Sequence, residues 1–170
     1  MTGAHVGDRK RDRGREGVML RQYAALPWRR GRHGRIEVMM VTSRGRGRWI
    51  LPKGWRVKGK TPAQSAATEA CEEAGVSGFV DEEPIGSYSC FWEGGDGREL
   101  REVVVYGLEV VATLADWAEK GQRRRAWMPL PEAARAAGEP GLARIIEGLA
   151  SRSLREREPS AAPVALHAFA

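Results

Sequence analysis

The chain has 170 residues, of which 42% are hydrophobic and 29% charged, a balance typical of one globular domain. No apolar run is long enough to cross a bilayer, the charged start is not a secretory signal, and the two cysteines form no disulfide framework or CxxC pair. We therefore expect a cytoplasmic protein with reduced cysteines and no membrane partner. The formal net charge of +6 favours phosphates and other anions as partners.

The positive charge is concentrated at the start of the chain. The segment 9–15 contains five basic residues and one acidic residue. This composition favours a basic disordered tail over 1–17, with an arm that holds a polyanion as the alternative. Apolar residues begin near Val18, so we expect one domain over 18–156 and a loose C-terminal tail over 157–170.

Strand and helix signals alternate through the domain. Strand patterns cover 23–28, 36–41, 49–51, 85–92, 98–111 and 126–128. The first strand is expected to end at Pro27 or just after it. Glycine-rich turns fall at 31–34, 45–47 and 94–97. Helices are predicted at 62–74, from Pro131, and over about 141–154. Strands interleaved with one central helix predict an α/β fold with a mixed sheet and helices on both faces.

The helix over 62–74 has the clearest boundary signals. Thr61 can cap its N-terminus, Pro62 suits the first helical position, and Gln64 completes a capping box. Gly75 supplies the left-handed residue that ends the helix. One face carries only small residues, which allow close approach to a sheet: Ala63, Ala66, Ala67, Ala70 and Ala74.

Three glutamates share another face of this helix. Glu69, Glu72 and Glu73 stand at i, i+3 and i+4, so their like charges lie close together. A solvated acidic surface is one interpretation of this pattern. The other is a site for hard divalent cations, because carboxylate oxygens suit magnesium and manganese.

The segment 54–76 resembles the Nudix box, G-x5-E-x7-R-E-U-x-E-E-x-G-U, in which U is a bulky apolar residue. The residues in register are Gly54, Glu69, Glu72, Glu73, Gly75 and Val76. Lys60 replaces the first glutamate of the box and Thr68 replaces its arginine. The flanks at 24–54 and 117–127 look like the diphosphoinositol polyphosphate phosphohydrolase branch of that family.

The resemblance implies a Nudix-type α/β/α sandwich with the glutamate-bearing helix packed on the sheet. It implies magnesium- or manganese-dependent hydrolysis of a diphosphate linkage, with diphosphoinositol polyphosphates or dinucleoside polyphosphates favoured and nucleic acid less favoured. Glu69, Glu72 and Glu73 would hold the metal and act in catalysis, the Lys53 carbonyl would add a ligand, and Glu119 is a further candidate base. Candidate substrate-binding residues are Arg21, Ser43, Arg44, Arg48, Lys53, Trp55 and Arg125.

Two other functions are compatible with the sequence. The segment from Gly54 to Thr61 also satisfies G-x4-G-K-[ST], the phosphate-binding loop of P-loop NTPases. That interpretation leaves the glutamate triplet and Gly75 unexplained. A Nudix-fold binding module for nucleotides or nucleic acid, with little catalysis, is the second alternative, and the departures at Lys60 and Thr68 favour it.

Overall fold

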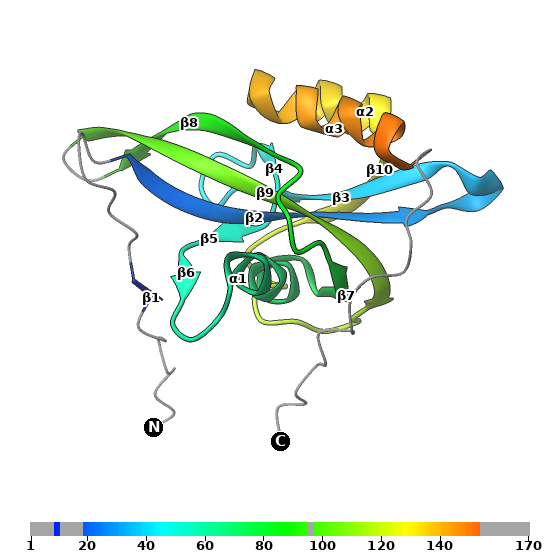
Figure 1. The fold of residues 1–170 in the computed structure, drawn as a ribbon, viewed down its shortest axis with the longest axis horizontal. Helices are drawn as coiled ribbons and strands as arrows, with labels where there is room; N and C mark the ends of the chain where they lie inside the picture. The colour runs from blue at the N-terminus through cyan, green and yellow to red at the C-terminus, as the bar shows by residue number, and fades with distance from the viewer. Residues whose placement is uncertain (1–8, 11–18, 95–96, 154–170) are drawn as a thin grey trace.

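The computed structural model describes residues 9–10, 19–94 and 97–153 (Figure 1). Its strands are β1 (Arg9–Lys10), β2 (Leu20–Arg30), β3 (Ile36–Thr42), β4 (Trp49–Ile50), β5 (Lys53–Gly54), β6 (Arg56–Val57), β7 (Val76–Val80), β8 (Gly86–Gly94), β9 (Gly97–Thr113) and β10 (Arg125–Pro129). Its helices are η1 (Arg32–Gly34), α1 (Pro62–Glu69), the π-helical turn η2 (Ala70–Ala74), α2 (Leu130–Ala136) and α3 (Pro140–Ser153). No described helix is long and apolar enough to cross a membrane.

One mixed sheet forms the centre of the molecule, with the strand order β10-β3-β2-β9-β7. The two long strands β2 and β9 run parallel, and their other neighbours pair with them antiparallel. Strand β9 pairs with β8 along its first half and with β7 along its second half. The predicted hairpin at 94–97 is confirmed, since the β8–β9 ladder ends with Gly94 opposite Gly97.

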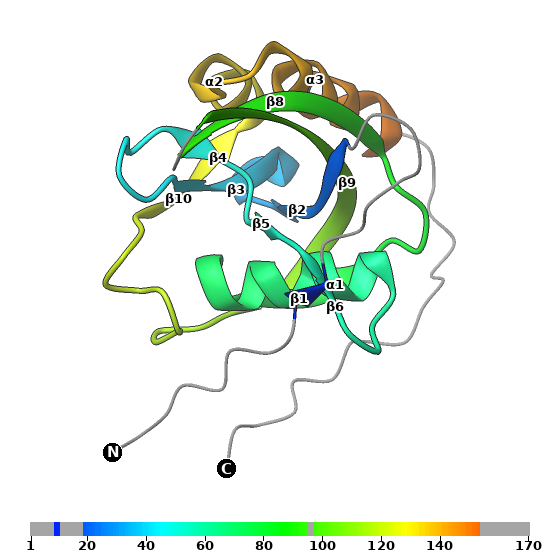
Figure 2. The same ribbon diagram turned by 90° about the vertical axis from the view of Figure 1, so that its left-hand side faces the viewer.

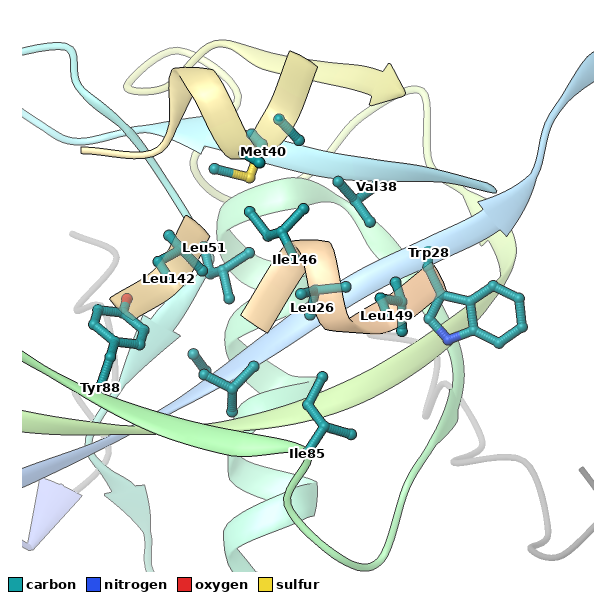
Figure 3. Close-up of a cluster of buried hydrophobic side chains, with 14 of the residues drawn as sticks. Leu26, Trp28, Val38, Met40, Leu51, Ile85, Tyr88, Leu142, Ile146 and Leu149 are labelled. Atoms are coloured by element: carbon teal, nitrogen blue, oxygen red, sulfur yellow. The ribbon is translucent and has the colours of Figure 1, made fainter. Parts of the chain in front are cut away.

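Helices cover both faces of this sheet (Figures 1 and 2). Helices α2 and α3 pack on one face over a hydrophobic cluster that includes Leu26, Met40 and Ile146, shown in Figure 3. Helix α1 and η2 pack on the opposite face through alanines, against residues such as Met39 and Leu108. The predicted α/β/α sandwich with a mixed sheet and a packed glutamate helix is confirmed.

The first strand continues beyond Pro27 and Trp28, further than predicted. Strand β2 continues to Arg30 and pairs with β9 as far as Trp28. On its other edge β2 exchanges one partner for another: β5 pairs only with Tyr23 and Ala24, and β3 pairs from Trp28 onward. Pro27 lies in the gap between these two partners, so its missing N–H leaves no ladder bond unmade.

Strand β7 was not predicted from the sequence. Ser77 and Gly78 interrupt its apolar pattern, and the register with β9 shifts between them. A side chain at Gly78 would collide with the backbone oxygen of Glu109, so the glycine permits close approach of the two strands. The two-residue strands β5 and β6 were also not predicted, because segments so short have no periodicity to detect.

The predicted tails fall almost wholly outside the described residues. Residues 157–170 lie beyond the described part, as do 1–8 and 11–17 of the N-terminal segment. Arg9 and Lys10 are described, and they pair antiparallel with Val57 and Arg56 as strand β1. The basic tail over 1–17 and the loose tail over 157–170 stay predictions.

Candidate active site

The predicted helix forms with the predicted boundaries. The Thr61 hydroxyl accepts the Gln64 N–H at 3.1 Å, and the Gln64 side chain accepts the Thr61 N–H at 2.9 Å, which makes a complete capping box. Gly75 ends the segment with φ +62°. A Cβ at this position would lie 2.8 Å from the Trp117 ring, so the site requires glycine for conformation and for space.

The last turn of the segment, η2, is a π-helix that carries two of the three glutamates. Short π-helical turns inside α-helices are often found at functional sites. Glu69 and Glu73 are buried, with exposed fractions of 2% and 5%, whereas Glu72 is half-buried. The expectation that one face of the helix presents all three carboxylates is therefore met only by Glu69 and Glu73, which line a common pocket.

This pocket has a volume of about 380 Å³ and lies at the end of the sheet where β5, β8 and the loops after β3 and β9 meet. It combines carboxylates and cations. The acidic side chains that line it are Glu69, Glu73, Glu93, Glu119 and Glu139. The basic ones are Arg44, Arg46, Arg48, Lys53, Arg101 and Arg123. Such a pocket can bind an anionic ligand and still place carboxylates beside it.

Arg123 connects two of the pocket carboxylates. Its guanidinium donates to Glu73 Oε1 and to Glu119 Oε2, each at 2.6 Å, and to the backbone oxygen of Thr42 at 2.9 Å. The Arg123 and Glu73 side chains are both almost fully buried. Burial raises the pKa of Glu73 to about 7, although Arg123 and the Lys53 N–H favour the ionised form. Glu73 therefore titrates close to neutral pH.

Lys53 and Gly54 of β5 contact the two buried carboxylates, Glu73 and Glu69. The backbone N–H of Lys53 donates to Glu73 Oε2 at 3.2 Å. The Lys53 ammonium donates to the Gln22 side chain at 3.0 Å. Burial lowers the pKa of the Lys53 ammonium. The Glu69 carboxylate lies against the Cα of Gly54, where an added Cβ would stand 2.2 Å from Glu69 Oε1. No residue with a side chain fits at this position unless Glu69 moves.

Five of the predicted substrate-binding residues meet in the pocket: Ser43, Arg44, Arg48, Lys53 and Trp55. The Ser43 hydroxyl accepts the Arg48 N–H at 3.0 Å and so shapes the turn that carries both residues. Arg44 donates to Gln122 at 3.2 Å. No carboxylate of the described residues forms an ion pair with Arg48, which leaves its guanidinium available for a ligand phosphate.

Two predicted substrate-binding residues lie elsewhere. Arg125 donates to the backbone oxygens of Ala74 and Leu114 at 2.7 Å and stacks on Trp117, so it fastens the end of η2 to the loop after β9. These contacts occupy its guanidinium, and Arg125 is not among the residues that line the pocket, so the substrate-binding role stays a prediction. Arg21 is an exposed residue of β2 that pairs with Glu102 at 2.8 Å, outside the residues that line the pocket.

Sequence reasoning missed Arg101 and Arg123. Arg101 has a usable signal, because it interrupts the alternation of β9 on the same face as the buried Val103 and Val105. Arg123 has none: it is one of three consecutive arginines that differ in environment, with Arg124 exposed.

The two residues that depart from the Nudix box contact each other. The Lys60 ammonium donates to the Thr68 hydroxyl at 2.7 Å, so the positions that carry opposite charges in the box remain paired here by a hydrogen bond. Lys60 and Thr61 thus both bond to residues of helix α1, and residues 53–54 and 56–57 form the short strands β5 and β6. This arrangement contradicts the P-loop interpretation, in which the backbone of 54–61 would wrap around phosphates.

The side chains of the site fit a hard divalent cation by donor type. Glu69, Glu73 and Glu119 offer carboxylate oxygens, which magnesium and manganese prefer. Within the described residues, no three His, Cys, Asp or Glu side chains converge closely enough to form a complete metal site. Magnesium usually keeps several waters or substrate oxygens as ligands, so a site with fewer protein ligands remains compatible with this ion.

The comparisons with known proteins agree with this geometry. The family model of the NUDIX domain matches residues 19–149. Nudix hydrolase 12, mitochondrial, of Arabidopsis thaliana is 34% identical over 107 residues, which are 58% of this chain and 51% of that protein. Diphosphoinositol polyphosphate phosphohydrolase 3-beta of Homo sapiens is 34% identical over 100 residues, 57% of each chain. This chain thus spans about half the length of these curated relatives.

Solved structures share the fold. A Caenorhabditis elegans Ap4A hydrolase in a binary complex superposes with a TM-score of 0.60 at 18% identity, over 79% of this chain and 97% of that one. The NUDIX domain of Shewanella oneidensis NrtR, complexed with ADP ribose, gives 0.59 at 17% identity, over 80% and 89% of the two chains. With the family model matching most of the domain, the chain belongs to the Nudix family.

Proposed function

We propose that this protein hydrolyses a diphosphate linkage in a phosphate-rich substrate, with magnesium or manganese as cofactor. The observation that carries the proposal is the composition of one pocket, in which the buried carboxylates Glu69 and Glu73 face a group of arginines and a lysine. A pure anion-binding site has no use for buried carboxylates. A site that must bind phosphate oxygens and also deliver water to phosphorus needs both kinds of group.

The cations of the pocket bind the substrate in this proposal. Arg44 and Arg48 lie on the turn after β3, and the planar guanidinium of each can bind two phosphate oxygens at once. Lys53 also lines the pocket, and its Nζ, which donates to Gln22, adds a further hydrogen-bond donor for phosphate oxygens. Together these groups hold the diphosphate chain in place for attack on one phosphorus.

Glu69 and Glu73 hold the metal from inside the pocket in this proposal, and Glu72, half-buried beside Glu73 in η2, and the Lys53 carbonyl are further ligands. When bound, the ion would neutralise charge on the phosphate oxygens and lower the pKa of a bound water. Glu119 is the candidate base, because it lines the same pocket and Arg123 joins it to Glu73. Arg123 holds both carboxylates in fixed orientations, so any proton that Glu119 accepts is taken at a defined point of the pocket.

The substrate class is favoured by the relatives. One of them is named a diphosphoinositol polyphosphate phosphohydrolase, and a structural neighbour is an Ap4A hydrolase. Both names describe compounds with consecutive phosphates, which suit the basic pocket. A cytoplasmic location stays a prediction, because several relatives from Arabidopsis thaliana are named mitochondrial. Cell fractionation measures it directly.

The test is phosphate release from a panel of diphosphate compounds, with and without magnesium or manganese. The panel includes dinucleoside polyphosphates, inositol pyrophosphates, nucleoside triphosphates, a nucleotide sugar and a capped RNA. We expect metal-dependent turnover of one class, its loss in Glu73→Gln, and its retention in Glu132→Gln, a matched change on the exposed surface of α2. Full activity of Glu73→Gln would contradict the metal assignment. Absence of turnover across the panel would favour the binding module.

A further inference from the structure

Most of the exposed apolar side chains of the described residues lie at one end of the sheet, near the tip of the β8–β9 hairpin. The described residues include five exposed large hydrophobic side chains, and only Val111 lies away from that end. The other four, with exposed fractions between 38% and 47%, are Met19, Phe91, Trp92 and Leu100. A single apolar residue on a surface needs no explanation, whereas a contiguous group marks an interaction site.

Three of these side chains lie side by side in one row. Phe91 is opposite Leu100 in the β8–β9 ladder, so both project from the same face of the hairpin. Met19 directly precedes Leu20, which is beside Arg101 in the β2–β9 ladder, so Met19 lies next to Leu100. We call Met19, Leu100 and Phe91 the apolar row. Its last member belongs to β8, so the row reaches the edge of the sheet.

The edge at which the row ends is open. Within residues 9–10, 19–94 and 97–153, β8 forms a backbone ladder with β9 alone, and its other edge pairs with no strand. A groove of about 800 Å³ lies beside it, lined by residues that include Ser87 and Ser89 of β8 and Arg144 and Gly148 of α3. From Ser87 to Trp92 the strand has no proline and no charged residue, the features that keep edge strands from pairing. This edge can therefore accept another strand.

The charges at this end of the sheet are already engaged within the chain. Two ion pairs lie here, Arg21–Glu102 at 2.8 Å and Arg101–Glu99 at 2.6 Å. Arg98 stacks on Phe91, with its guanidinium carbon 3.7 Å from the ring centroid. An apolar centre with a rim of internally paired charges is typical of a protein–protein interface. It offers few free cations to a nucleic acid or to an anionic lipid surface.

We propose that this protein forms a twofold dimer in which the β8 edges of two copies pair antiparallel. A twofold axis near Phe91 brings the same surface of both copies together, so each edge supplies the strand that the other lacks. The same axis joins the two apolar rows end to end. Specific interfaces bury about 1,200 Å² or more in total. Three side chains and one strand edge lie near that lower limit, so we expect a weak dimer with a dissociation constant of roughly 100 μM.

Sedimentation equilibrium of the full chain, from about 1 μM to about 1 mM, measures this association. Leu100→Glu places a charge in the apolar row, and Ser89→Lys places one on the open edge. Each should weaken dimerisation about tenfold. Val111→Glu is the matched control, because Val111 is an exposed apolar residue of the same strand β9 outside the row, and it should dimerise as the wild type does. Circular dichroism and thermal unfolding check that each variant keeps the fold.

Hydrogen exchange of the wild type distinguishes edge pairing from contact through the apolar row alone. Amide exchange within Gly86–Gly94 should slow as the protein concentration rises, because the open edge gains hydrogen-bond partners, while exchange within Val76–Val80 should stay constant. A wild type that sediments as a monomer at about 1 mM would overturn the dimer, also where it cosediments with anionic phospholipid vesicles. Wild-type dimerisation in either folded variant, or β8 exchange that does not depend on concentration, would overturn it too.

Discussion

The substitution Gly54→Ala tests the role of the Glu69 carboxylate with a single methyl group. An ideal Cβ on Gly54 lies 2.2 Å from Glu69 Oε1 and 2.3 Å from its carboxyl carbon, and its other near neighbour is the second oxygen of the same carboxylate. The backbone of Gly54 is not in a left-handed conformation, so alanine introduces no strain there. The methyl group therefore perturbs one functional group and little else.

The size of the effect follows from that distance. Ordinary van der Waals contact of a Cβ begins at 3.4 Å, so the carboxylate oxygen must move by about 1.2 Å. A displacement of about 1 Å at a reacting centre can cost roughly 100-fold in rate. We expect kcat to fall about 100-fold. The free energy of unfolding should fall by only about 1 kcal/mol, because a side-chain end moves and the backbone does not.

The assay is the initial rate of metal-dependent phosphate release on the best substrate of the panel, beside thermal unfolding of the metal-free protein. Gly121→Ala is the matched control, because a Cβ there meets no atom within 4 Å and Gly121 has no positive φ. A Gly54→Ala protein with the kcat of the wild type would refute the reasoning, since Glu69 would then act equally well from a displaced position.

Three further predictions concern the surroundings of the site. Arg123→Ala should lower the free energy of unfolding, measured by urea denaturation, by about 3 kcal/mol, because it leaves the buried carboxylate of Glu73 without its ion pair. An equal decrease in Arg124→Ala, a change at an exposed arginine, would contradict this. Gly75→Ala should cost about 2 kcal/mol through its φ of +62°, and a wild-type melting temperature would count against it. Burial raises the pKa of the Cys90 thiol above its ordinary 9.0, which lowers the thiolate fraction. At pH 8, in a Cys71→Ser background, iodoacetamide should therefore alkylate Cys90 more slowly than a free thiol, and a rate equal to that of glutathione would disprove the shift.

Local signals predicted the glutamate helix well. Thr61, Gln64 and Gly75 act through atoms within a few residues of themselves, and the capping box and the left-handed end formed as expected. The hairpin between β8 and β9 was also predicted, because a glycine-rich turn between two apolar strands is a local pattern. In contrast, β7 depends on its partner β9, and Ser77 and Gly78 give it no pattern of its own.

The candidate site was also predicted only in part: the sequence identified the glutamates and missed two of the arginines. The spacing of Glu69 and Glu73 within one helix was enough to place both carboxylates on one side. Arg101 and Arg123 lie in β9 and in the loop before β10, and their distances from the glutamates depend on how the sheet brings these elements together. Nothing in the run of arginines at 123–125 distinguishes the one that pairs with Glu73 from the one that holds the end of η2.

The amino-acid sequence by itself determined the family, the boundaries of the glutamate helix and the acidic chemistry of the site, because these depend on residue types at short, regular spacings. The tertiary structure decided which cations face those carboxylates, that Arg125 holds the end of η2, and that Arg101 packs against the Trp92 ring at the pocket wall. The physical reason is separation along the chain. The Arg123 side chain and the backbone oxygen of Thr42, for example, are 81 positions apart and meet only after the sheet has formed.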